Sequence, residues 1–382
     1  MYNRDIANLV NRYAEIFPVL CITGPRQSGK TTIARKIFPH LPYLSLENLD
    51  TRELALNDPR KFLSQYPNGA IFDEIQHAPD ILSYLQGIVD ESPQKGKYVI
   101  TGSQNFTISN TVSQSLAGRV GMITLLPLSL RELNAPQNSM LSVLNGGYPA
   151  LHKSKMIPEE FYPSYIKTYI ERDVRDIKNI GDLSKFQTFL KLCAGRTGQL
   201  INFSSLATDA GISHTTAREW LSILEASYII FTLQPFYKNF SKRLIKMPKL
   251  YFYDTGLACS LLGIENTSQL ETHYLKGGLF ENLVILEILK HRFNKGKDTN
   301  MYFWRDRSVE IDLICEWGGK ILAVEIKSSS TFQSEYIKNL QYFDKLAGEV
   351  EKYLVFDGNT DGKFLDVYLT PLSKISDILL KD

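Results

Sequence analysis

Short runs of consecutive apolar residues alternate with segments of helical spacing over the first third of the chain. Runs of this length between turn residues are typical of buried strands, and apolar residues every three to four positions are typical of helices. Strands that alternate with helices predict a parallel α/β sheet. The expected elements are strands at about 19–23, 43–46, 69–72, 98–102 and 122–126, and a helix at 79–90.

The pattern becomes helical in the middle of the chain, where Phe186, Phe189, Leu190 and Cys193 form one apolar face. FSSLATDAGIS indicates a short helix with a glycine-containing turn, and HTTAREWLSILEAS indicates a second helix capped by Ser213. YIIFTLQPF then alternates bulky residues as a strand does. Helix, turn, helix and strand in this order predict a winged-helix segment.

A hairpin is expected near the end of the chain, in EIDLICEWGGKILAVEIKS. A two-residue turn at Gly318-Gly319 would pair Trp317 with Lys320 and fix the register of both strands. The stretch 342–375 indicates a helix and two further strands. Together these elements predict a small mixed sheet.

Composition is that of a folded protein with several domains. The 382 residues are 43% hydrophobic and 22% charged, and this length predicts two or three domains. A net charge of +2 excludes a global basic field, so a nucleic-acid footprint would have to be local. The four cysteines are far apart and lack CxxC spacing, which favours buried free thiols over disulfides or a zinc site.

Membrane segments are not expected from the sequence. The opening MYNRDIANLV lacks the apolar core of a signal peptide. No apolar run approaches the roughly 20 residues that cross a bilayer. We therefore expect a soluble, cytoplasmic protein without a membrane partner.

A glycine-rich motif follows the first predicted strand. GPRQSGKT fits GxxxxGK[ST], with a strand before it and a helix after it. In such a loop, backbone N–H groups wrap the phosphates, the lysine reaches the β- and γ-phosphates, and the hydroxyl binds Mg²⁺. We therefore expect ATP and Mg²⁺ as cofactors. The residues expected to bind them are Gly24, Pro25, Arg26, Gln27, Ser28, Gly29, Lys30, Thr31 and Thr32.

Two carboxylates end the third predicted strand, in GAIFDEIQ. Asp73 is expected in the Mg²⁺ shell, and Glu74 is expected to polarise the attacking water. An adjacent Asp-Glu pair favours ATP hydrolysis over phosphate transfer. The next strand ends in TGSQ, where Gln104 is the expected γ-phosphate sensor and Ser103 the alternative. A plain strand-end cap is the open alternative.

Arg119, in SLAGR, is a candidate for neutralising charge that develops on the γ-phosphate. It would act in its own subunit or in a neighbour within a homo-oligomer. A surface arginine that pairs with a carboxylate is the open alternative.

The order GPRQSGKTT, FDEIQ, TGSQ, SLAGR, LPLSLREL, GGYP and YIERDV resembles the prokaryotic AAA-type ATPases that carry a C-terminal domain of unassigned function. The resemblance covers nearly the whole chain. It implies a winged-helix segment in the middle but does not settle the partner of that segment. Because one strand intervenes between the two motif strands in sequence, we expect the Asp-Glu strand beside the P-loop strand, as in the AAA-like branch.

DNA is the expected partner at two places, with protein docking as the alternative. In DNA-reading winged helices the start of the second helix enters the major groove. The window YKNFSKRLIKMPK is the most basic in the chain and suits backbone contacts, although its lysines would also protect an edge strand. The candidate contacts are His214, Thr215, Thr216, Arg218, Lys238, Lys242, Arg243, Lys246 and Lys249.

The predicted hairpin register places Asp312 opposite Glu325 and puts both on one face with Lys327. A divalent cation, Mg²⁺ or Mn²⁺, would relieve the repulsion, and Lys327 would orient water or stabilise a phosphate. With Glu281 from an upstream helix, the pattern Glu…Asp…Glu-x-Lys resembles the restriction-endonuclease-like nucleases. An inactive fold, with Lys327 paired to Glu310, is the alternative.

The predicted organisation is an AAA-type P-loop ATPase domain at 1–150, a helical and winged-helix domain at 151–265, and a small mixed α/β nuclease-like domain at 266–382. The function we expect is Mg-dependent ATP hydrolysis coupled to DNA binding, with DNA cleavage left open. The alternatives are a DNA-binding regulator and a protein-docking signalling ATPase, each with an inactive nuclease fold.

Overall fold

A computed structural model describes residues 2–92, 94–103, 115–134, 138–154, 156–174, 180–236, 247–306, 308–375 and 378, with only the backbone at 171–174. Within these ranges, no helix is long and apolar enough to cross a membrane.

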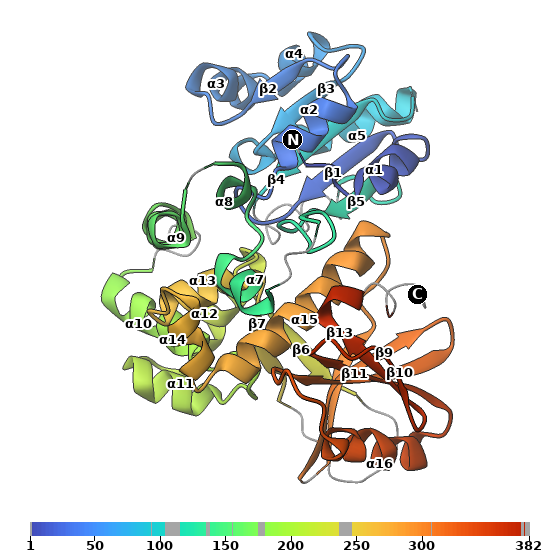
Figure 1. Ribbon diagram of the computed structural model, residues 1–382. Helices are drawn as coiled ribbons and strands as arrows, with labels where there is room; N and C mark the ends of the chain where they lie inside the picture. The colour runs from blue at the N-terminus through green and yellow to red at the C-terminus, as the bar shows by residue number, and fades with distance from the viewer. Residues whose placement is uncertain are drawn as a thin grey trace.

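The first sheet has five parallel strands in the order β2-β3-β4-β1-β5 (Figure 1). The parallel α/β sheet predicted from the apolar runs is confirmed, with boundaries that differ by up to two residues. The strands are β1 (Val19–Thr23), β2 (Tyr43–Ser45), β3 (Ala70–Asp73), β4 (Tyr98–Gly102) and β5 (Val120–Thr124).

The expectation that the Asp-Glu strand lies beside the P-loop strand is wrong. β1 pairs with β4 and β5, and the Asp-Glu strand β3 pairs with β2 and β4. Every residue of β1, β3 and β4 is buried, so apolar pattern alone does not decide which of them is central. Helical crossovers allow β4 to enter between the other two strands.

Helices cover both faces of this sheet. Leu20 and Ile22 face a hydrophobic cluster with α1 and α2, while Val19 and Cys21 face a second cluster with α3, α4 and α5. All four cysteines are free and buried, as predicted. The helices are α1 (Ala7–Ala14), α2 (Lys30–Ile37), α3 (Leu49–Asn57), α4 (Pro59–Ser64) and α5 (Ile81–Glu91), with a 3-10 turn at Ile75–His77.

The middle of the chain is helical. Three helices, α10 to α12, precede the antiparallel pair β6 (Ile230–Pro235) and β7 (Lys249–Phe252), and Ser213 Oγ caps α12 by accepting from the Thr216 N–H at 3.0 Å. The helices here are α7 (Ser139–Asn145), α8 (Pro149–Lys153), α9 (Pro158–Tyr165), a π-helical segment (Ile166–Val174), α10 (Leu183–Ala194), α11 (Phe203–Ala210), α12 (His214–Ala226), α13 (Thr255–Leu261) and α14 (Thr267–Thr272).

The second sheet is larger than predicted. Its order is β12-β13-β11-β10-β9-β8-β6-β7, so the strands after α12 belong to it. The join is the parallel pairing of Gln234 with Tyr302. The expected two strands after the hairpin are in fact three. The remaining elements are α15 (Lys276–Asn294), β8 (Met301–Asp306), β9 (Val309–Trp317), β10 (Lys320–Lys327), α16 (Lys338–Ala347), β11 (Val350–Phe356), β12 (Gly362–Phe364) and β13 (Val367–Pro371), with 3-10 turns at Ser334–Ile337 and Leu372–Lys374.

The hairpin register agrees with the prediction. Lys320 pairs with Trp317, and the register continues to Val324 opposite Leu313. Gly318 and Gly319 have φ of 57° and 79°, which is the left-handed region that a two-residue hairpin turn requires.

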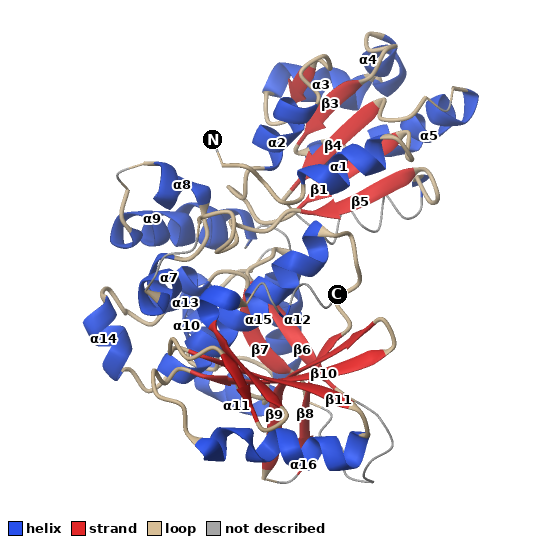
Figure 2. Cartoon of the chain, turned by 45° about the vertical axis from the view of Figure 1, so that its right-hand side comes forward, coloured by secondary structure: helices blue, strands red, loops and turns tan. Residues whose placement is uncertain are grey.

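Two helices sandwich the second sheet (Figure 2). α16 packs on one face, and α15 packs on the other within a cluster that also includes residues of α10 to α12. The middle helices and the C-terminal sheet therefore share one hydrophobic core. α15 runs from this core toward the first sheet, where it contacts β5.

Candidate functional site

The loop between β1 and α2 has the backbone that a phosphate-wrapping loop needs. Gly24 and Gly29 have φ of 142° and 98°, and Gln27 is also left-handed with φ of 63°. A Cβ atom on Gly24 would lie 2.1 Å from the carbonyl oxygen of Leu125, so no other residue fits at this position.

Lys30 is buried and its ammonium is held by the loop itself. Its Nζ donates to the carbonyl oxygens of Gly24 at 3.0 Å and Pro25 at 2.9 Å. Burial lowers the pKa of Lys30, and the nearby Glu74 and Asp73 carboxylates oppose that shift. The ammonium therefore lies at the loop where phosphates would bind, with neutral oxygens as its present partners.

Asp73 gathers three hydroxyl groups at the end of β3. Its carboxylate accepts from Thr31 Oγ1 at 2.9 and 3.0 Å, from the Tyr43 hydroxyl at 2.7 Å, and from Thr101 Oγ1. Burial and the hydrogen bond to Asp73 raise the pKa of Tyr43 to about 12. The Thr31 hydroxyl and the Asp73 carboxylate are hard oxygen donors side by side, which fits the Mg²⁺ shell expected there.

Glu74 follows in a left-handed backbone conformation, with φ of 56°. A non-glycine residue with a left-handed backbone is strained, and such residues are often found at functional sites. Glu74 Oε2 accepts from Gln76 Nε2 at 2.5 Å and from Ser103 Oγ at 3.2 Å. Ser103, the alternative sensor, thus lies against Glu74, while Gln104 lies outside the described residues. Sequence reasoning missed Gln76, whose place two residues after Glu74 gave no signal.

Arg119 is not brought to the P-loop of its own chain. It precedes β5 at the amino end of the sheet, where its carbonyl accepts from the Val19 N–H. Its Nε donates to Asp90 Oδ1 at 2.5 Å, and its Nη2 donates to Asp90 Oδ2 at 2.9 Å. The P-loop lies at the opposite, carboxyl end of the sheet, so this arrangement matches the surface ion pair that was the open alternative.

The outer P-loop residues contact the N-terminal segment and the middle helices. Arg26 forms an exposed ion pair with Glu47 at 3.2 Å and lies over the ring of Tyr169. Arg4 donates to the Ser28 carbonyl at 2.8 Å. Ser28 Oγ is buried and has no hydrogen-bond partner among the residues described, which leaves one polar atom in the loop available to a ligand.

A cavity of about 150 Å³ adjoins the same loop. It lies next to Gly29, Thr32 and Ile33 and is bounded on other sides by Tyr2 and Pro149. Its lining therefore joins the N-terminal segment, α2 and the start of α8.

The second predicted centre lies on the hairpin of the second sheet. Lys327 Nζ donates to Glu325 Oε1 at 2.6 Å and lies 3.7 Å from Asp312 Oδ2. Asp312 Oδ2 also accepts from the Ile326 N–H at 2.8 Å. The three residues therefore share a face, as the register predicted. The alternative pairing of Lys327 with Glu310 is wrong, because Glu310 forms ion pairs with Lys249 and Arg305.

The carboxylates of this cluster are poorly solvated. Burial and the neighbouring Asp312 raise the pKa of Glu325 to about 8, against the opposing effect of Lys327. Glu325 Oε2 is buried without a hydrogen-bond partner among the residues described. Over those residues, no group of three or more His, Cys, Asp or Glu side chains is arranged to hold a metal ion. Asp312 and Glu325 would therefore be the two carboxylate ligands of a cation at this place, and carboxylate oxygens suit Mg²⁺ or Mn²⁺.

Lys249 is a member of this cluster that sequence reasoning missed. It was predicted as part of a DNA-contacting window, but β7 buries it, with Nζ 3.0 Å from Glu281 Oε1 and 2.5 Å from Glu310 Oε1. The Tyr251 hydroxyl donates to the same Glu281 oxygen at 2.5 Å. These carboxylates raise the pKa of Lys249 above its ordinary value despite its burial.

Of the DNA candidates, those at the start of α12 are exposed. His214, Thr215 and Arg218 reach solvent, and Arg218 lies 4.7 Å over the ring of Phe203. The basic candidates Lys238, Lys242, Arg243 and Lys246 lie outside the described residues.

Comparison with known families gives each part of the chain a match. Residues 17–134 match the model of the AAA domain. Residues 140–268 and 276–375 match two models, each described as a domain of unknown function (DUF8612 and DUF4143). The first part is therefore an AAA-type P-loop domain.

Two solved structures are similar over more than half of this chain. The Walker-type ATPase of Pyrococcus abyssi is 16% identical, with 68% of this chain and 96% of that chain covered and a TM-score of 0.43. AMPPCP-bound DnaA from Aquifex aeolicus is 12% identical, with 58% and 85% covered and a TM-score of 0.30.

Among protein sequences, an uncharacterized protein of Haemophilus influenzae is 21% identical over 337 residues, which is 80% of this chain and 81% of that protein. An uncharacterized protein of Mycobacterium tuberculosis is 31% identical over 334 residues, which is 86% of this chain and 74% of that protein. The chain therefore belongs to the family of the mycobacterial protein, with an AAA-type P-loop domain followed by regions to which the family descriptions assign no function.

Proposed function

We propose that this protein hydrolyses MgATP at the site formed by the P-loop and the ends of β3 and β4. The observation that carries the proposal is the contact of Thr31 with Asp73, directly beside a Glu74 whose carboxylate is held by Gln76. Lys30 would bind the β- and γ-phosphates, and Glu74 would orient and deprotonate the attacking water. Mg²⁺ on Thr31 and Asp73 would neutralise the phosphate charge.

The nucleotide base fits the cavity beside the loop. The loop that would wrap the phosphates ends where α2 begins. The cavity adjoins this place at Gly29 and Thr32. Ile33 and Pro149 supply apolar surface for a flat ring. Pro149 belongs to the GGYP motif, which gives this motif a role in nucleotide binding.

ATP state is coupled, in this proposal, to the C-terminal sheet through α15. Glu287 accepts from the Leu130 N–H, and Lys290 donates to the Leu128 carbonyl, both at 2.8 Å. Glu287 and Lys290 also pair with each other at 2.8 Å, and both are buried. Two charged side chains thus fix α15 to the segment that follows β5.

The same segment is tied to the P-loop by Arg4. The Arg4 guanidinium donates to the carbonyls of Leu126 at 2.6 Å and Ser28 at 2.8 Å. At the other end of α15, Glu281 belongs to the carboxylate cluster. A shift of the P-loop on nucleotide binding therefore has a continuous set of contacts through which to act on that cluster.

A second candidate activity is phosphodiester chemistry on DNA at Asp312, Glu325 and Lys327. Glu325 Oε2, which has no hydrogen-bond partner within the described part of the chain, and the convergence of Asp312 on the Lys327 ammonium favour it. A divalent cation there would activate water and polarise the phosphate. DNA would be positioned by the exposed start of α12 and by the basic residues Lys238, Lys242, Arg243 and Lys246. The alternative is an inactive cluster, held by its lysines, in a DNA-binding or protein-docking ATPase.

One set of variants separates these functions. Lys30→Ala should abolish ATP hydrolysis, whereas Asp312→Ala should leave it unchanged. Mg²⁺- or Mn²⁺-dependent cleavage of DNA by wild type, lost in Asp312→Ala and retained in Lys30→Ala, would establish the second activity. No cleavage of single- or double-stranded DNA by the wild type would exclude it. ATP hydrolysis unaffected by Lys30→Ala would exclude the first.

A further inference from the structure

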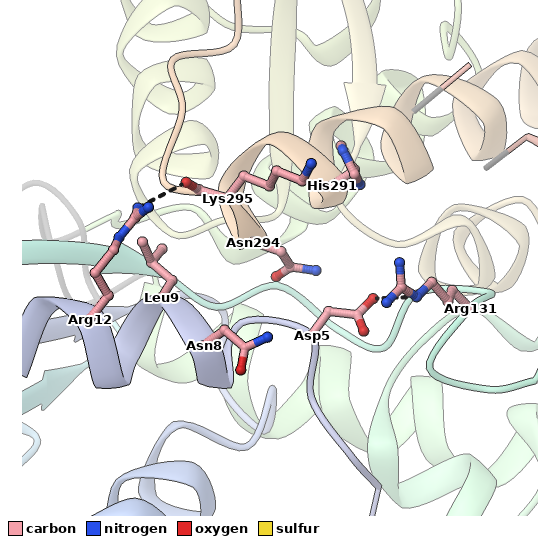
Figure 3. Close-up of a pocket in the computed structure, with 8 residues that line it drawn as sticks. All are labelled: Asp5, Asn8, Leu9, Arg12, Arg131, His291, Asn294 and Lys295. Carbon is pink, nitrogen blue, oxygen red and sulfur yellow. Dashed lines mark hydrogen bonds and ion pairs between the residues drawn. The ribbon is translucent and has the colours of Figure 1, made fainter. Parts of the chain in front are cut away.

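A cleft of about 330 Å³ lies between the first helix of the ATPase domain and the last turn of α15 (Figure 3). α1 contributes Asn8 and Arg12, and α15 contributes His291 and Asn294. No P-loop residue lines it. Its volume is within the range of small-ligand sites, about 300–1,000 Å³.

The two walls of the cleft are held together by close packing. A Cβ atom on Gly296, just after α15, would lie 2.7 Å from Leu9 Cδ1 and 2.8 Å from the Tyr13 hydroxyl oxygen. Arg12 also donates to the carbonyl of Lys295 at 3.4 Å, where the figure shows the two side by side. The cleft is thus a fixed feature of the contact between α1 and α15.

Positive charge dominates the lining. Arg12, Arg131 and Lys295 have cationic side chains, and Asp5 is the single carboxylate among the described residues that line the cleft. Asp5 lies 3.4 Å from Arg131 Nε, so it is already engaged. Three cations against one carboxylate leave a formal charge of +2, and a cleft lined mainly by one sign of charge attracts the other.

We propose that this cleft is a second phosphate-binding site, which takes a phosphate group from a free nucleotide or from a nucleic-acid strand. Arginine matches phosphate oxygens with paired N–H donors, and lysine adds a point charge. The Asn8 and Asn294 amides supply neutral donors between the cations, as Figure 3 shows. The inference does not rest on ATP hydrolysis at the P-loop.

The site would join two domains through one ligand. Arg12 belongs to the ATPase domain and Lys295 to the C-terminal part of the chain. A bound phosphate would contact both, so its binding would stabilise the contact between α1 and α15.

The test uses full-length protein carrying Lys30→Ala, which removes the P-loop lysine as a competing phosphate ligand. Binding of pyrophosphate and of a 12-nucleotide single-stranded DNA is measured by titration calorimetry and fluorescence anisotropy. In this Lys30→Ala protein, the double substitution Arg12→Ala/Lys295→Ala removes two cations from the cleft. A matched control, Arg60→Ala/Lys345→Ala, removes the same charge from exposed positions outside the cleft.

We expect the Kd of at least one probe to rise about 100-fold in Arg12→Ala/Lys295→Ala, about tenfold per cation, and to change little in the control. Loss for pyrophosphate alone identifies a free nucleotide as the source of the phosphate. Loss for the oligonucleotide alone, or for both, identifies a strand. Unchanged affinity for both probes overturns the proposal.

A second variant tests the cleft in case Arg12→Ala/Lys295→Ala fails to fold. Asn294→Asp places a carboxylate in the cleft without removing a cation, and the same loss of affinity is expected. Thermal unfolding of each variant is followed by circular dichroism. Full affinity for both probes in a folded Asn294→Asp protein overturns the proposal too.

Discussion

The Nζ atom of Lys249 lies 3.0 Å from Oε1 of Glu281, a contact that joins β7 to α15. Lys249 is 2% exposed and bridges on to Glu310. Among the described residues, removal of this ammonium takes the cation from Glu281 and leaves Glu310 with Arg305 alone. We expect Lys249→Met to lower the free energy of unfolding by about 3 kcal/mol, near the lower end for a buried pair broken on one side.

Urea unfolding measures the effect, with Lys249→Arg as the variant that keeps the charge and Lys345→Met as an exposed control. Lys249→Arg should retain most of the stability. A loss below about 1 kcal/mol in Lys249→Met, similar to a surface substitution, would show that the ammonium is not needed to hold the cluster.

Stability should depend on pH through the carboxylate cluster. Burial raises the pKa of Glu325 to about 8 and that of Glu281 to about 7, from an ordinary value of 4.5. At pH values between the ordinary pKa and the raised ones, the folded protein holds protons that the unfolded chain has released. The free energy of unfolding therefore falls as pH rises. In EDTA, we expect a decline from about pH 5 to pH 8 that is shallower in Glu325→Gln.

Denaturant midpoints at several pH values test this sign. Glu325→Gln mimics the protonated side chain, so it removes the contribution of that group alone. A wild-type stability that rises over this window, with the same slope in the variant, would contradict the raised pKa.

Gly24 and Gly87 make a matched pair of glycines. A Cβ atom on Gly24 meets the Leu125 carbonyl, whereas a Cβ atom on Gly87, in α5, meets nothing within 4 Å. Gly24→Ala should weaken ATP binding at least about tenfold by displacing the loop, and Gly87→Ala should bind ATP normally and be up to about 1 kcal/mol more stable. Fluorescent-nucleotide titration and thermal unfolding measure both. Normal ATP affinity in Gly24→Ala would show that the close approach is dispensable.

Gln76 is predicted to position Glu74. Its amide lies 2.5 Å from Glu74 Oε2, whereas Ser103 lies at 3.2 Å. Gln76→Ala should lower kcat for ATP hydrolysis about tenfold with little change in ATP affinity, and Ser103→Ala should have a smaller effect. Steady-state kinetics separate kcat from KM. A change in KM alone would assign Gln76 to nucleotide binding.

Features encoded by contiguous residues could be predicted from the sequence. The GxxxxGK[ST] spacing located the P-loop, and Gly318-Gly319 fixed the hairpin register, which continues to Val324 opposite Leu313. Both are set by local backbone geometry.

Features that depend on packing between distant segments could not be predicted. The position of β4 beside β1 depends on crossovers rather than on residue pattern. Lys249 lies in a lysine-rich stretch, and only the pairing of β6 with β8 brings its strand into the second sheet. Arg119 pairs with Asp90 on α5, which lies 29 residues earlier in the chain.

The most direct test of the proposed function is Mg-dependent ATP turnover by wild type and Glu74→Gln at saturating ATP. Removal of a general base typically costs 10²–10⁴ in rate, so kcat should fall at least about 100-fold while ATP affinity is retained. Equal turnover in the two proteins, or a wild type that binds ATP without Mg-dependent hydrolysis, would contradict the account.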